Sequence, residues 1–88
     1  MPNKLILDIS IGDKLKYYRK QKHLTQMEVV RAANLLGSMM SESTYAKIEQ
    51  GARNIFLSDF VILKIVLEFS YDELFRDIEE TILKKRTS

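Results

Sequence analysis

Helix start signals recur along the whole chain, and they restrict the fold more than any other feature of the sequence. Serine or threonine stands at positions 10, 25, 41, 58 and 70, each directly before a segment with helical apolar spacing. The side-chain oxygen at such a position accepts a hydrogen bond from an early backbone N–H group that otherwise lacks a partner. The spacing predicts five helices, over residues 10–21, 25–36, 41–50, 58–68 and 71–84.

Two starts carry the full capping-box pattern, in which an acidic residue three positions later returns a hydrogen bond to the cap. Thr25 with Glu28 fits this pattern, and so does Ser70 with Glu73. Ser10 followed by Asp13 is a less complete version of the same box. These pairs make the second and fifth helices the most clearly marked ones.

The low content of glycine and proline favours helices over strands. The 88 residues include three glycines and one proline, at position 2, which are too few for the turns of an all-β protein. Gly51 lies where a left-handed C-cap would end the third helix, whereas Gly37 either ends the second helix or lies in a loop. The sequence therefore predicts an all-α single domain over residues 1–88 that contains five helices.

Several function classes are disfavoured by what the chain contains. There is no cysteine and a single histidine, so neither a disulfide framework nor a metal site is expected. There is also no glycine-rich phosphate loop and no carboxylate pair in an apolar setting, so we expect no enzyme activity and no cofactor. No apolar run approaches the ~18 residues of a membrane span, and we expect a cytoplasmic protein.

The net charge of +2 conceals an uneven distribution. Residues 1–26 carry six Lys or Arg against two Asp, whereas residues 54–88 carry five basic against seven acidic residues. A basic N-terminal third predicts a surface that faces an anion such as nucleic acid. A solvated helix face is the alternative interpretation.

The second and third predicted helices are short, capped and joined by a turn, which is the outline of a helix-turn-helix. The residues at its marked positions are Ile11-Gly12, Leu15, Tyr18-Arg19, Leu24-Thr25-Gln26, Glu28-Val29, Ser41, Ser43-Thr44-Tyr45, Lys47-Ile48-Glu49-Gln50-Gly51, Arg53, Ile65, Leu67 and Asp72-Glu73-Leu74. With these residues the chain resembles the Cro/lambda-repressor-like (XRE) helix-turn-helix family over about residues 11–75.

The resemblance implies a homodimeric regulator of transcription, a repressor or autoregulator, that binds operator DNA. Its five-helix, lambda-repressor-like core would span residues 10–75, with residues 76–88 as a helical extension and tail. The recognition helix, 41–50, would enter the major groove. The alternatives are an interaction protein such as an antitoxin, or the DNA-binding head of a larger regulator.

The resemblance also assigns roles to individual residues. It implies base reading by Glu42, Ser43 and Lys47, phosphate contact by Gln26, Ser41, Thr44, Arg53 and Asn54, and a salt bridge between Arg19 and Glu49. A glutamate can accept from cytosine N4, and a lysine can donate to guanine. Glu42 as a partner of the helix dipole, Ser41 as a cap alone and Lys47 on phosphate are the alternatives.

Two apolar sets remain for other contacts. The segment between Thr25 and Gly51 is about five residues longer than the family pattern, which adds about 7.5 Å if helical. The additional set is Leu35, Leu36, Met39 and Met40, and it forms either extra core on an extended second helix or a contact surface for a protein partner. The set in the last helix is Leu74, Phe75, Ile78 and Ile82, which predicts a dimer interface or packing onto the domain's own core.

Overall fold

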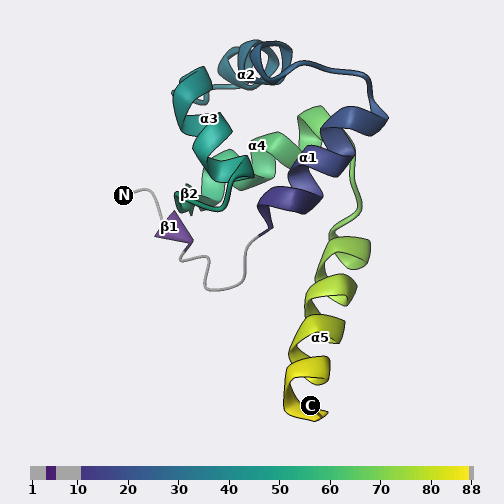
Figure 1. The fold of residues 1–88 in the computed structure, drawn as a ribbon. Helices are drawn as coiled ribbons and strands as arrows, with labels where there is room; N and C mark the ends of the chain where they lie inside the picture. The colour runs from purple at the N-terminus through teal and green to yellow at the C-terminus, as the bar shows by residue number, and fades with distance from the viewer. Residues whose placement is uncertain (1–3, 6–10, 88) are drawn as a thin grey trace.

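The computed structural model describes residues 4–5 and 11–87, and this part of the chain folds into five α-helices and one short strand pair (Figure 1). The helices are α1 (Gly12–Gln21), α2 (Gln26–Leu35), α3 (Glu42–Glu49), α4 (Leu57–Leu67) and α5 (Tyr71–Thr87). The strands β1 (Lys4–Leu5) and β2 (Ile55–Phe56) pair antiparallel, with Lys4 opposite Phe56. The all-α prediction is confirmed, whereas the strand pair is not predicted by the sequence pattern.

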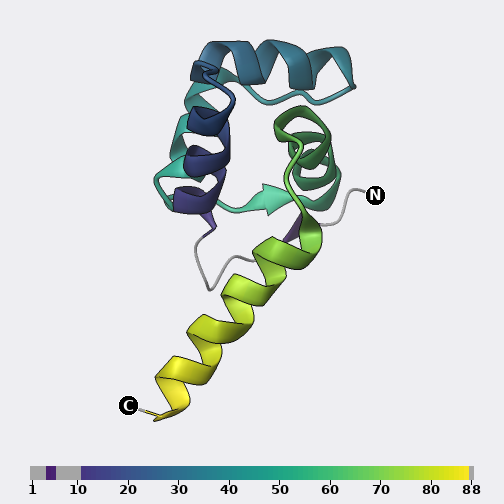
Figure 2. The ribbon, with the colours of Figure 1, turned by 90° about the vertical axis from the view of Figure 1, so that its right-hand side faces the viewer.

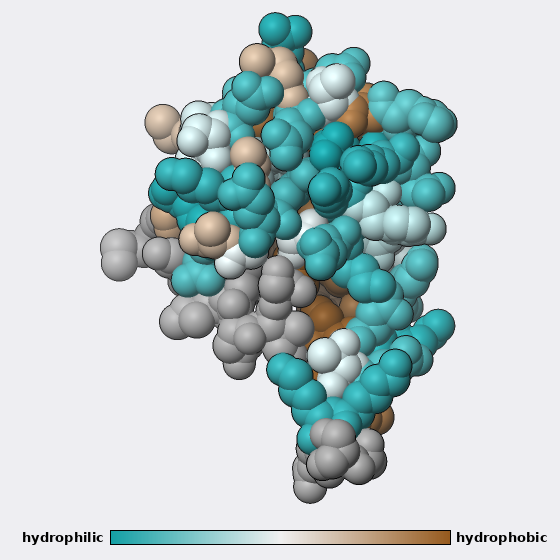
Figure 3. Space-filling model, in the orientation of Figure 1, coloured by the Kyte–Doolittle hydropathy of each residue, from teal (hydrophilic) through white to brown (hydrophobic). Residues whose placement is uncertain are grey.

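Helices α1 to α4 enclose a single apolar core. Helix α2 lies at one end of this body, in contact with α3 and α4, and α5 extends from the opposite end (Figure 1, Figure 2). The residues with the largest completely buried side chains are Tyr45, Leu15, Ile48, Ile55, Leu63, Leu74 and Val29. Polar side chains cover most of the face in Figure 3, and apolar surface is visible where α5 joins the body.

The helix starts largely follow the predicted caps. Thr25 and Glu28 form both bonds of the capping box, and Ser41 accepts a hydrogen bond from the Thr44 N–H. The Ser70 hydroxyl likewise accepts from Glu73 N–H at 3.2 Å.

The prediction for the cap of the fourth helix is wrong. That helix begins at Leu57, and its N-cap residue is Phe56, which makes no side-chain cap bond. Because Phe56 is paired with β1, the chain passes directly from the strand into the helix before Ser58 is reached. The predicted cap at Ser10 lies outside the described residues.

Gly37 and Gly51 end α2 and α3 in the same way. Both have positive φ angles, 102° and 76°. After α3, the Gly51 N–H donates to Ile48 O and the Ala52 N–H to Lys47 O, which is the Schellman arrangement. Equivalent bonds from Gly37 and the next residue close α2. The extra residues therefore lengthen the connection between α2 and α3 rather than the helix itself.

The four apolar residues of the predicted additional set, at the end of α2 and in the connection, divide into buried and exposed ones. Met40 is buried in the core, whereas Leu35 is 88% and Met39 is 96% exposed. Leu36 is about half exposed. The prediction of extra core holds for Met40 alone, and the other three side chains face solvent.

The prediction that Leu74 belongs to a dimer interface is wrong. Its side chain is completely buried in the core of its own chain, because the first turn of α5 packs against the body. Tyr18 and Phe69 stack there at 4.8 Å between ring centroids, and Phe69 also meets the ring of Tyr71. On the same helix, Ile78 is partly buried against the core.

The close approach of α1 to the end of α3 gives the first testable prediction. A Cβ atom on Gly12 would meet the backbone carbonyl oxygens of Ile48, at 2.6 Å, and of Glu49. Backbone atoms cannot move aside as a side chain can, so we expect Gly12→Ala to destabilise the fold by about 2–3 kcal/mol. Thermal denaturation would then show a melting temperature about 10–20 °C lower.

Asp13→Ala is the matched control, because Asp13 is the next residue and is exposed. Its effect should stay within about 0.5 kcal/mol. Equal melting temperatures for the two variants would contradict the close approach.

Candidate nucleic-acid interface

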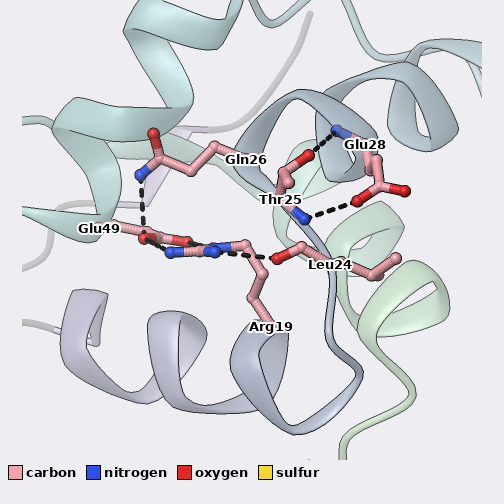
Figure 4. A network of polar contacts seen from close by, with 6 residues as sticks. All are labelled: Arg19, Leu24, Thr25, Gln26, Glu28 and Glu49. Carbon is pink, nitrogen blue, oxygen red and sulfur yellow. Dashed lines mark hydrogen bonds and ion pairs between the residues drawn. The ribbon is translucent and has the colours of Figure 1, made fainter.

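A buried ion pair fixes the end of α3 against α1. Arg19 donates from Nε to Glu49 Oε2 at 2.7 Å and from Nη2 to Glu49 Oε1 at 3.0 Å (Figure 4). The exposed fractions of the two side chains are only 11% and 3%. Two parallel bonds between planar groups set orientation as well as distance. The Arg19–Glu49 pair that the sequence predicts is therefore present, in its bidentate form.

The turn after α1 supplies a third partner for the guanidinium group. His23 has a φ of 57°, and its N–H donates to Lys20 O, while the Leu24 N–H donates to Arg19 O. This left-handed cap brings the Leu24 carbonyl to 2.9 Å from Arg19 Nη1 (Figure 4). No signal in the sequence predicts this contact of the Leu24 carbonyl.

Gln26, the first residue of α2, joins the same network. Its Nε2 donates to Glu49 Oε1 at 3.1 Å, so residues from the α1–α2 region and from α3 meet at one carboxylate (Figure 4). An amide nitrogen carries two hydrogens, so this bond leaves a second donor on the Gln26 side chain. Gln26 is half-buried, at the N-terminal end of α2.

The network keeps Glu49 ionised. Burial alone would raise the pKa of Glu49, but its hydrogen bonds with Arg19 and Gln26 hold that pKa below the ordinary value. The same bond to Glu49 raises the pKa of Arg19. Burial also raises the pKa of Tyr45, so this core phenol stays neutral. Among the residues that the structure describes, Arg19 and Glu49 are the only buried charged side chains.

The remaining residues of α3 separate into two faces. Tyr45, Ile48 and Glu49 are buried, whereas Glu42, Ser43 and Lys47 are exposed. All three residues predicted to read bases thus occupy one solvent-facing side of the helix.

Ser41 and Thr44 lie at the N-terminal end of α3. Ser41 Oγ accepts from the Thr44 N–H at 3.1 Å and is also hydrogen-bonded to Thr44 Oγ1. The capping role of Ser41 is therefore present in the structure. Gln26 contacts Glu49 at the other end of this eight-residue helix, so these three predicted phosphate contacts are divided between the two ends of α3.

A hollow of about 350 Å³ brings Thr44 together with the two remaining predicted phosphate contacts. Thr44, Arg53 and Asn54 all line it, although they come from α3 and from the segment after it. Met39, from the lengthened connection before α3, lines the same hollow. No signal in the sequence predicts that Met39 lies beside these polar residues.

Neither the comparisons with known proteins nor the search for membrane-spanning helices and metal sites identifies a function for this chain. A scan against protein-family models and a search of curated proteins find no match to this chain. Among residues 4–5 and 11–87, no helix is long and apolar enough to cross a membrane. The same residues contain no group of three or more acidic or histidine side chains that could hold a metal ion.

The buried pair gives a prediction for stability and its pH dependence. Arg19→Met leaves Glu49 buried without its main partner, so we expect a loss of about 3–5 kcal/mol at pH 7. In the native protein the pKa of Glu49 is lowered, so its stabilising contribution is present at neutral pH and is lost as the pH falls through that pKa. The cost of Arg19→Met should therefore shrink towards pH 4, as measured by urea denaturation.

Lys14→Met is the control, because Lys14 pairs with Asp77 at 2.8 Å on the surface. Exposed pairs contribute about 0–1 kcal/mol. A similar loss in both variants, or a cost of Arg19→Met that does not change with pH, would contradict the role of the buried pair.

Proposed function

We propose that this chain is an XRE-type regulator of transcription that binds double-stranded DNA as a homodimer, with α3 in the major groove. The observation that carries the proposal is the exposed face of α3, formed by Glu42, Ser43 and Lys47 and held in place by the buried Arg19–Glu49 pair. The major groove of B-DNA is about 12 Å wide and admits an α-helix. Under this proposal the chain is a cytoplasmic DNA-binding protein that catalyses no reaction and holds no cofactor.

The two ends of α3 fit the two sides of such a groove. Gln26 contacts the C-terminal end of α3, whereas Ser41 and Thr44 lie at its N-terminal end. The eight residues of α3 rise about 12 Å in total, so the length of the helix is close to the width of the groove. Helix N-termini attract phosphate because their first N–H groups point outward. The second donor of the Gln26 amide and the N-terminal ends of α2 and α3 would therefore contact the backbones on either side of the bases.

The exposed side chains of α3 supply different chemistry to base edges. The Glu42 carboxylate accepts hydrogen bonds and suits cytosine N4, whereas the Lys47 ammonium donates and suits guanine O6 or N7. The Ser43 hydroxyl can do either. Arg53 follows α3 on the hollow shared with Thr44 and would contact phosphate rather than a base.

Helix α5 supports the proposal of a dimer. Its 17 residues extend about 26 Å, and its outer part leaves the body (Figure 2). Phe75 and Ile82 are 48% and 44% exposed, with partly buried Ile78 between them on the same side of the helix. A second copy that covers this side would remove apolar surface from water.

Selection of bound duplexes from random DNA tests the proposal. We expect Glu42→Ala and Lys47→Ala each to relax preference at one base position, by about 1–3 kcal/mol. Arg53→Ala should instead weaken binding to all sequences and reduce the salt dependence by about one phosphate contact.

Lys20→Ala is the control, because Lys20 is an exposed residue of α1 that is assigned no base contact. Its base preference should match that of the unmodified protein. No enriched sequence at low salt, together with a tightly bound protein that co-purifies, would replace this proposal with that of an interaction protein.

The dimer is tested separately by Ile82→Asp. A charge in the proposed apolar contact should raise the dimer dissociation constant at least about tenfold. Lys84→Asp introduces the same side chain about 150° around the helix from the centre of this apolar side and should change association little. Sedimentation equilibrium measures both, and an unchanged dissociation constant for Ile82→Asp would place the interface elsewhere.

A further inference from the structure

The lengthened connection between α2 and α3 exposes Met39 more completely than any other large apolar side chain that the structure describes. Its exposed fraction is 96%, whereas Ser38 and Met40 on either side are each 6% exposed. An apolar side chain between two buried neighbours is not the tip of a loose loop. Its exposure follows from a backbone that is fixed on both sides.

Hydrogen bonds explain why the backbone is fixed. The Asn34 side-chain amide donates to Ser38 O at 2.9 Å and to Met40 O at 3.1 Å, so one amide group bonds on both sides of Met39. The Met40 N–H also donates to Ser38 Oγ at 3.1 Å. The Schellman bonds at Gly37 hold the start of the same turn. Met39 therefore projects from an ordered turn, at a defined place relative to α3.

That place is beside the proposed DNA-binding surface. Met39 precedes the N-cap Ser41 by two residues, so their Cα atoms are at most about 7.6 Å apart. Met39 also lines the same hollow as Thr44 and Arg53. Leu35, which is nearly as exposed, does not line this hollow.

We infer that Met39 is a specificity residue that contacts the C5-methyl group of a thymine in the major groove. The inference rests on the proposed function and adds one base contact to it. Thymine is the only base that presents an apolar group in that groove. Successive bases on one strand are about 3.4 Å apart. We therefore expect Met39 to contact a thymine one or two base pairs outside the base pair that Glu42 contacts. The flexible thioether adapts to such a contact without a polar partner.

The test uses the full chain and the duplex that it selects best from random DNA. Each thymine of that duplex is replaced in turn by deoxyuridine, which lacks only the methyl group. We expect about a fourfold loss of affinity at a thymine one or two positions outside the base pair that responds to Glu42→Ala, as expected for one buried methyl group. Met39→Ala should bind the thymine and deoxyuridine duplexes equally.

Leu35→Ala is the matched control, because it removes a nearly equally exposed apolar side chain, from the last position of α2. It should retain the fourfold loss on deoxyuridine substitution. The inference is overturned if Met39→Ala keeps that loss, or if no thymine is selected or required at these positions.

The two proposals fail in different ways. A chain that selects DNA but shows no methyl dependence through Met39 overturns this inference and leaves DNA binding intact. A chain that binds no duplex, but loses a protein partner on Met39→Ala, overturns both.

Discussion

The buried pair of Arg19 and Glu49 is the interaction on which the arrangement of the other helices around α3 depends. Helix α3 has eight residues, and isolated helices of this length are not stable in water. Its position therefore comes from tertiary contacts. The pair joins it to α1, Gln26 joins it to α2, and Gly12 allows the α1 backbone to approach its last carbonyl groups.

The ion pair fixes the rotation of α3, which apolar packing alone does not. Apolar burial is non-directional, so Tyr45 and Ile48 anchor α3 to the core without fixing its rotation closely. The two parallel bonds from Arg19 to Glu49 have a defined plane and fix that rotation. A buried charge pair gives little net stability because of its desolvation cost, so orientation is the more substantial contribution of this one. The buried ion pair therefore determines which side of α3 faces solvent.

Local features of the sequence predict this structure better than distant pairings do. The Thr25 box and the Gly51 cap depend on residues within a few positions of each other, and both are present. The β1–β2 pair joins residues some fifty positions apart through two-residue strands, too short to show a periodic pattern. Leu74 belongs to a helical apolar stripe, but a stripe does not specify whether its own core or a second copy covers it. Likewise, the exposure of Met39 depends on how Asn34 folds the turn.

The left-handed residues that end α1 and α4 show how far this fold lies from its highest attainable stability. His23 and Glu68 both have a φ of 57°, a conformation that costs residues other than glycine about 1–2 kcal/mol. Glu68 also forms an ion pair with Lys22 on the surface. His23 donates its backbone N–H to close α1, a bond that glycine would make equally well. Selection has thus kept enough stability for the fold to form without removing every strained position, as expected for a protein held above a threshold rather than at an optimum.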